Sequence, residues 1–251
     1  MDPQTAPAKL GTLEILRRYP FKGMRGEDID EAFVTFPGLI GDRAYAFVDP
    51  SRPSNFPWMT GRLVREMILF QPRFLATPDP KQEHPSRKDF VAEVRTPEGE
   101  KLSVDDPGFT AYFEKRFQRS LELRFSERAM QDACPVSLFG LDSVRKLSDE
   151  AGFPLDHRRF RANFYVRWEN RKPYYEQELV GAKLRIGEKL IMMVVENNER
   201  CVIINLDPTT AEATPRVLEV VARNHASCCG VYGSVLREGI VRAGDAVYAV
   251  D

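Results

Sequence analysis

The chain has 251 residues, of which 43% are hydrophobic, and its formal net charge at pH 7 is −1. This length allows one large domain or two domains of about 100–150 residues each. The balanced charge creates no field that would attract nucleic acid or an anionic membrane, so we expect neither partner, and any anion site must be local.

Several features favour a cytoplasmic protein with reduced thiols. The first eight residues contain neither the basic nor the apolar segment of a signal peptide. No apolar stretch approaches the roughly 18 residues of a membrane-spanning helix. The four cysteines are scattered and do not resemble the disulfide framework of a secreted domain.

The first third of the chain is predicted to consist mostly of short strands. β-branched and aromatic runs at 10–19, 32–36 and 44–48 are separated by Gly and Pro. Residues 77–90 are polar and rich in proline, which indicates an exposed loop. A turn is expected at Glu98-Gly99 within residues 95–102.

Three helices are predicted. The first begins at Asp106-Pro107, with the aspartate as cap, and the recurrence of Phe109, Phe113 and Phe117 predicts a buried stripe. The second covers 142–152 and ends at a glycine. The third begins at 214–215, and the tail 239–248 is predicted to form strand, turn and strand.

Cys201 is the most informative residue. We predict one strand over 190–195, a connection at 196–199 and a second strand after the cysteine. A thiolate beside Arg200 could be a soft metal ligand or a nucleophile. Taken alone, a cysteine in a β-rich stretch is more often a small buried hydrophobic residue.

Strand runs outnumber helices, and the chain has no regular alternation of strands and helices. This pattern predicts a mainly β fold with some α structure (α+β), in which two intimately packed β-barrel-like domains carry a few covering helices. We expect one domain at 9–120 and the other at 121–251.

The sequence contains no Gly-rich dinucleotide motif, no phosphate-binding P-loop and no H-E-x-x-H motif. A zinc site at His225 and Cys228-Cys229 would need a second ligand pair that the sequence lacks. Arginines 158, 159 and 161 at a strand entrance could grip an anion or form a solvated turn. Glycines beside Lys22, Arg43 and Arg62 would let backbone N–H groups approach a phosphate.

Taken in order, a series of short blocks resembles the MOSC-domain family (molybdenum cofactor sulfurase C-terminal type) with its N-terminal β-barrel partner, similar to amidoxime-reducing-component-like proteins. The blocks are Tyr19-Pro20-Phe21-Lys22-Gly23, Gly41-Asp42-Arg43, Thr60-Gly61-Arg62, Leu141-Asp142-Ser143-Val144, Arg159-Phe160-Arg161-Ala162-Asn163, Arg200-Cys201 and Val241-Arg242-Ala243-Gly244-Asp245.

The resemblance implies a molybdenum cofactor (molybdopterin) between the two barrels. Cys201 would be the protein ligand of molybdenum and the catalytic residue. The residues at family positions near the pterin and its phosphate are Lys22, Gly23, Arg43, Thr60, Arg62, Ser143, Arg159, Arg161, Asn163 and Arg200. Two departures from the family pattern are Gly23, where relatives often have serine, and the carboxylate of Glu199 before the Arg-Cys pair.

The resemblance also implies an oxidoreductase that reduces N-hydroxylated small molecules with electrons from a separate flavin or iron–sulfur protein. The alternative is a carrier of cofactor or sulfur that bears a persulfide on Cys201 and receives its sulfur from a donor protein. A third possibility is a scaffold that has lost the cofactor. Some MOSC domains are fused to pyridoxal-phosphate-dependent desulfurases, but we expect no pyridoxal phosphate in this chain.

Overall fold

The computed structural model describes residues 8–52, 56–79 and 85–250. The expected loop at 77–90 and the N-terminal segment therefore lie partly outside the described residues. The strands are β1 (Lys9–Arg18), β2 (Glu27–Asp28), β3 (Glu31–Thr35), β4 (Gly38–Leu39), β5 (Tyr45–Val48), β6 (Gln71–Ala76), β7 (Val91–Arg95), β8 (Lys101–Ser103), β9 (Glu122–Phe125), β10 (Val136–Gly140), β11 (Phe164–Trp168), β12 (Lys183–Ile186), β13 (Leu190–Glu199), β14 (Cys228–Arg237), β15 (Gly239–Arg242) and β16 (Ala246–Val250). The helices are α1 (Phe109–Phe117), α2 (Leu141–Ala151), α3 (Tyr175–Glu178) and α4 (Arg216–Asn224), with 3₁₀ turns η1 (Arg65–Leu69), η2 (Arg87–Asp89), η3 (His157–Phe160) and η4 (Val202–Asn205).

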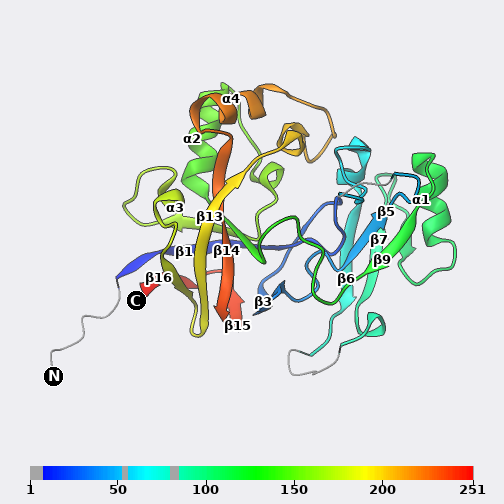
Figure 1. Ribbon diagram of the computed structural model, residues 1–251, viewed down its shortest axis with the longest axis horizontal. Coiled ribbons are helices and arrows are strands. Elements are labelled where there is room, and N and C mark those ends of the chain that lie inside the picture. The colour runs from blue at the N-terminus through cyan, green and yellow to red at the C-terminus, as the bar shows by residue number, and fades with distance from the viewer. Residues whose placement is uncertain (1–7, 53–55, 80–84, 251) are drawn as a thin grey trace.

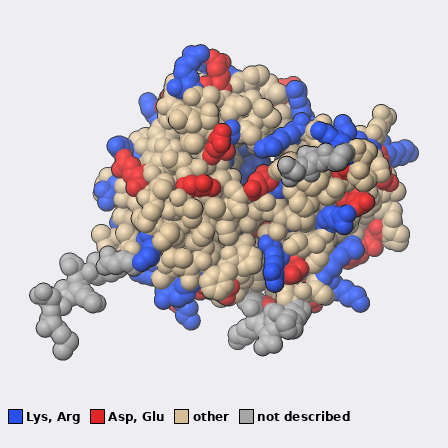
Figure 2. All heavy atoms as spheres, viewed as in Figure 1, with Lys and Arg blue, Asp and Glu red and all other residues tan. Residues whose placement is uncertain are grey.

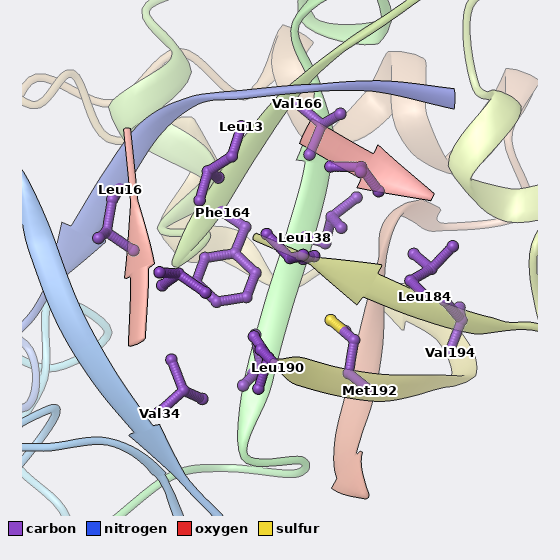
Figure 3. Close-up of a cluster of buried hydrophobic side chains, with 14 of the residues drawn as sticks. Leu13, Leu16, Val34, Leu138, Phe164, Val166, Leu184, Leu190, Met192 and Val194 are labelled. Atoms are coloured by element: carbon purple, nitrogen blue, oxygen red, sulfur yellow. The ribbon is translucent and has the colours of Figure 1, made fainter. Parts of the chain in front are cut away.

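A closed barrel of seven strands forms the larger part of the molecule (Figure 1). Its strands run in the order β11, β10, β14, β13, β12, β16 and β1, and β1 pairs with β11 to close the ring. Alternating apolar residues fill the interior, where Leu13, Leu138, Phe164 and Met192 point toward one another (Figure 3). The strands are thus held by one continuous apolar core.

The second part of the molecule is built from two small sheets, β5-β9 and β6-β7-β8, around an aromatic core. The sheet β15-β3-β4 packs instead against the barrel core, to which it contributes Val34, Leu39 and Val241. Phe113 on α1 is fully buried, and its ring centroid lies 5.0 Å from that of Phe47 and 5.1 Å from that of Phe70. The predicted buried stripe is confirmed, because Phe109 and Phe117 are buried on the same helix face. The helix itself begins at Phe109 rather than at Pro107, since Asp106 accepts a hydrogen bond from the Gly108 N–H in a turn that precedes it.

The two parts exchange strands. β1 comes from the N-terminal end of the chain but completes the barrel, whereas β15 comes from the C-terminal end and pairs with β3. β9 follows residue 120 and still pairs with β5. Segments far apart in the sequence therefore meet along the junction of the two parts.

The mainly β fold with covering helices is confirmed, as are the helix at 142–152 and the two strands of the tail. The third helix begins at Arg216, next to the expected start, and α2 and α4 share one apolar cluster over the barrel. Within the described residues, no helix has the length and apolar character needed to cross a membrane.

The chain around Cys201 differs from the prediction. β13 continues to Glu199, which is paired with Cys228 on β14, so the expected connection at 196–199 is part of the strand. The apolar run after the cysteine forms η4 instead of a second strand. Tertiary context overrides the β propensity of this run, since Ile204 packs into the core while Val202 is 53% exposed.

Candidate functional site

A pocket of about 470 Å³ lies at the junction of the two parts of the molecule. Residues from the first third of the chain form one wall, and residues near the ends of β13, β14 and η3 form the other. Figure 2 shows a hollow between the two parts, with side chains of both charges gathered around it. Eight of the predicted site residues line the pocket: Lys22, Gly23, Arg43, Thr60, Arg62, Arg161, Arg200 and Cys201.

Cys201 stands where β13 has ended and η4 begins. Its thiol is half-buried and free, and it lies on the pocket wall. The neighbouring Arg200 is fixed by two hydrogen bonds, from Nε to the Cys229 carbonyl (2.7 Å) and from Nη1 to the Phe160 carbonyl (2.8 Å). The guanidinium that precedes the cysteine is therefore held in a fixed position on the pocket wall.

Gly230 leaves room for this guanidinium. Its φ is +70°, and a Cβ at this position would lie 2.9 Å from Nη2 of Arg200. The Arg200 guanidinium also lies over the ring of Phe160, 5.7 Å from its centroid. Local backbone shape and ring contacts thus preset the position of the charge.

Lys22 supplies a buried cation on the opposite wall. Only 4% of it is exposed, and its Nζ donates to the Met130 carbonyl (2.5 Å) and forms an ion pair with Asp132. Burial lowers the pKa of Lys22 and the Asp132 carboxylate opposes this, while Arg43 and Arg161 lower it further. An anion in the pocket would favour the charged form of this lysine.

Arg43 and Arg161 form a stacked pair at the base of the site. Both have a left-handed backbone, with φ of 50° and 53°, and both guanidinium groups lie over the Tyr19 ring at 4.6 and 4.5 Å from its centroid. Burial opposes the charge of Arg43, but the buried Asp42 carboxylate and Tyr19 keep its pKa above the ordinary value. Burial lowers the pKa of Arg161, which has no carboxylate partner among the described residues.

The described pocket wall has more basic than acidic side chains. Its cations are Lys22, Arg43, Arg62, Arg161 and Arg200, and its carboxylates are Asp132, Glu196 and Glu199. Glu196 and Glu199 are exposed, so water screens their repulsion of an anion better than it screens the buried cations. The pocket is suited to a ligand that carries negative charge.

Three of the predicted site residues lie outside the wall of this pocket. The Ser143 hydroxyl donates to Glu176 Oε2 (3.1 Å) and accepts from the Tyr174 N–H (2.8 Å). Arg159 binds the Asn205 carbonyl (2.9 Å), and Asn163 pairs with Ser137 across β10 and β11. These hydrogen bonds run within the fold, and none of the three residues lines the pocket.

The partner of Ser143 leads to a pH-dependent stability prediction. Glu176 is fully buried, and burial raises its pKa although Ser143 and Trp168 donate to the carboxylate. A carboxyl group whose folded pKa is raised favours folding while it is protonated, so the free energy of unfolding should fall as the pH rises from about 4.5 through the raised pKa. We expect Glu176→Gln to remove this fall, which thermal unfolding at a series of pH values would measure.

The control for this substitution is Glu178→Gln on the same short helix. Glu178 is half exposed and pairs with Lys172 on the surface, so its substitution should leave the pH profile of the melting temperature nearly unchanged. If both variants retained the wild-type profile, the buried carboxyl group would not be its origin.

The pocket also contains residues that were not predicted to belong to it. Cys228, considered from the sequence only as a zinc ligand, lines the pocket together with Cys201, and the aromatic rings of Phe56, Phe160 and Tyr232 complete the lining. Cys228 reaches the pocket because its strand pairs with the segment just before Cys201. The sequence analysis predicted a connection at 196–199 instead of a strand, so this pairing was not expected.

The described residues give no support to a zinc site. His225 Nε2 lies 2.6 Å from Glu150 Oε2, and Cys229 is fully buried with a pKa raised to about 11 by burial. No group of three or more potential metal-ligating His, Cys, Asp or Glu side chains occurs among them. Any metal in the pocket would need most of its ligands from a bound cofactor.

Gly23 explains one departure from the family pattern. Its φ is +84°, and a Cβ would lie 2.9 Å from both the Met59 carbonyl oxygen and Thr60 Cα. We expect Gly23→Ser to lower the free energy of unfolding by about 1–3 kcal/mol, because it combines backbone strain with a backbone contact. Chemical denaturation would measure the loss.

Gly181→Ser is a matched control for that change. Gly181 also has positive φ, at +90°, but a Cβ there would meet no atom within 4 Å. Its substitution should cost only the conformational strain, about 1 kcal/mol. Equal losses in the two variants would show that the contact with Met59 and Thr60 is relieved by a local shift.

Comparisons with known proteins identify a domain family and structures that are similar in fold. A family model for the MOSC domain matches residues 126–248. The crystal structure of the YuaD protein from Bacillus subtilis is similar in fold, with a TM-score of 0.52 at 12% identity over 96% of this chain and 97% of that one. YiiM from Escherichia coli is a more distant match, with a TM-score of 0.44 at 11% identity over 97% of this chain and 71% of that one. A search of curated proteins returns no match. On the strength of this match, residues 126–248 of the chain form a domain of the MOSC family.

Proposed function

We propose that this protein binds a molybdenum cofactor in the pocket through Cys201 and acts as an oxidoreductase on N-hydroxylated small molecules. The observation that carries the proposal is a free thiol on the wall of a basic pocket within a MOSC-domain protein. MOSC domains are associated with the molybdenum cofactor.

The residues of the pocket fit this cofactor in three respects. The volume of about 470 Å³ is typical of a small-molecule site. Phe56, Phe160 and Tyr232 offer flat surfaces to a planar pterin. Among the described residues of the wall, the soft ligands are thiols, which suit a metal already bound to the sulfurs of a dithiolene.

Each basic residue has a role that follows from its position. Lys22, Arg43 and Arg161 are buried or partly buried cations that would bind the phosphate end of the cofactor by charge-assisted hydrogen bonds. Arg200, held in place by its hydrogen bonds, would add a fixed positive charge for the anionic groups of the cofactor. The buried Thr60 and the exposed Arg62 also line the pocket, where they would contact the pterin or the substrate.

The bound cofactor would supply the two-electron chemistry that removes oxygen from an N-hydroxylated substrate. The product is the reduced nitrogen compound and water, so two electrons and two protons must arrive for each turnover. We propose a separate flavin or iron–sulfur protein as the electron donor. The exposed Glu196 and Glu199 at the pocket mouth are positioned to pass protons between water and the site.

A second candidate function is a carrier of sulfur or cofactor without turnover. The observation that favours it is the second thiol, Cys228, on the same pocket wall as Cys201. A persulfide on Cys201 would have a second sulfur acceptor nearby, and a donor protein would have to deliver the sulfur.

The test is reduction of benzamidoxime by protein produced in a cofactor-competent host, with a chemical electron donor. We expect turnover in the wild type, loss of turnover in Cys201→Ser and retention in Cys228→Ser. Cyanide-releasable sulfur is measured on the same samples. A wild type without turnover but with releasable sulfur on Cys201 would support the carrier, and absence of both activities would leave a scaffold.

A further inference from the structure

A second, much smaller cavity lies next to the main pocket and is lined by arginines. Its volume is about 20 Å³, and five guanidinium side chains contribute to its wall: Arg17, Arg25, Arg158, Arg159 and Arg161. No carboxylate belongs to the lining formed by the described residues. Arg161 and Ile203 line both cavities and so separate them.

Two of these arginines are held rigidly within the fold. Arg17 is 3% exposed and donates from Nη2 to the Gly26 carbonyl at 2.8 Å. Arg159 is 6% exposed and donates from Nη2 to Asp207 Oδ2 at 2.8 Å. Their guanidinium groups cannot turn toward bulk water without breaking these bonds.

The cluster has more positive than negative charge. Arg17, Arg158 and Arg159 form ion pairs with Asp28, Asp156 and Asp207, respectively. Arg25 and Arg161 are different, since within the described ranges their hydrogen bonds run only to the carbonyls of Pro208 and Met24. Two guanidinium charges are therefore left without a paired carboxylate at this junction.

The cluster also contains buried donors without acceptors. The Nε–H groups of Arg17, Arg25 and Arg159 are inaccessible to solvent and make no hydrogen bond to the described residues. A buried donor left without an acceptor destabilises the fold. Burial lowers the pKa of Arg25, Arg158 and Arg17 lower it further, and the carboxylates of Asp156 and Asp207 oppose this shift.

We infer that this cavity is a binding site for a monatomic anion, with chloride as the ligand. The volume admits one water-sized particle, and chloride is only slightly larger than water, whereas a phosphate or sulfate is too large. A water molecule could accept from one or two of the N–H groups but would leave the excess charge in place. A chloride ion accepts from several guanidinium groups at once and neutralises one of the two unpaired charges.

The site would tie distant segments together. Arg17 and Arg25 come from the N-terminal end of the chain, and the other three come from the turn that includes η3. An anion between them would strengthen the junction on which the main pocket is built. Because Arg161 lines both cavities, this anion would compete with a ligand of the main pocket for the Arg161 guanidinium. The inference does not depend on the cofactor or on the activity of the protein.

The test has a solution arm and a crystallographic arm. The melting temperature is followed as sodium chloride replaces sodium gluconate at constant ionic strength, so that general screening stays fixed. We expect a saturable rise of about 2–4 °C for the wild type. In crystals grown with sodium bromide, we expect an anomalous peak between Arg25 and Arg159.

Two variants distinguish chloride binding in the small cavity from chloride binding in the main pocket. Arg25→Gln removes one unpaired charge of the cluster and should abolish the chloride response, whereas Arg62→Gln removes an exposed cation of the main pocket and should keep it. A wild type that melts at the same temperature in chloride and gluconate, with no bromide peak at the arginines, would overturn the inference. A response retained in Arg25→Gln would also overturn it.

Discussion

Protein carrying Cys201→Ser is expected to contain at least about tenfold less molybdenum per chain than the wild type after purification from a cofactor-competent host. Serine preserves the size of the side chain but replaces a soft, ionisable sulfur by a hard hydroxyl that stays protonated. The local fold should persist, because the backbone carbonyl of Cys201 still accepts the Ile204 N–H that begins η4. Metal analysis by mass spectrometry gives the ratio directly.

The matched control for this substitution is Cys228→Ser. Both thiols are half-buried and line the same pocket, so the two variants make the same substitution at two positions of one site. We expect Cys228→Ser to retain nearly the wild-type molybdenum content and both variants to melt close to the wild type. Equal molybdenum content in the wild type and Cys201→Ser would contradict the assignment of Cys201 as the ligand. Loss in Cys228→Ser alone would move the ligand to the other thiol.

The sequence predicted much of the fold because its signals there are local. The phenylalanine spacing at 109, 113 and 117 fixes the buried face of α1, and Gly152 marks the end of α2. The closure of the barrel by β1 and β11 is different, since it joins residues about 150 positions apart and leaves no local pattern. For the same reason the exchange of β15 into the sheet of β3 could not be seen.

The candidate site was also only partly predictable from the sequence. Lys22, Arg43 and Cys201 are far apart in the chain, and only the order of the family-like blocks that contain them predicted a shared site. The family-like blocks do not distinguish a residue that lines the pocket from a residue that supports the fold. The predicted site therefore also included Ser143, whose hydroxyl bonds within the fold. It missed Cys228, because the thiol reaches the pocket through strand pairing rather than through a motif.

Lys22→Met is expected to weaken retention of the cofactor by about 10–100-fold, because it removes one charge-assisted hydrogen bond from a buried cation. The methionine fills the same space, and the freed Asp132 is half exposed, so water can solvate it. The measurement is the molybdenum retained per chain after timed dialysis. Retention equal to that of the wild type would show that Lys22 serves only its contacts with Met130 and Asp132.

The pH dependence of retention distinguishes a binding role from a structural one. Burial lowers the pKa of Lys22, so its charge is lost at a lower pH than that of an ordinary lysine, and retention should fall as the pH rises through that lowered pKa. Because an anion favours the charged lysine, binding in this range should take up a proton. Lys22→Arg keeps its charge throughout, so its retention should stay level with pH even if it is weaker overall. A lysine that only supports the fold would give the same alkaline profile in both proteins.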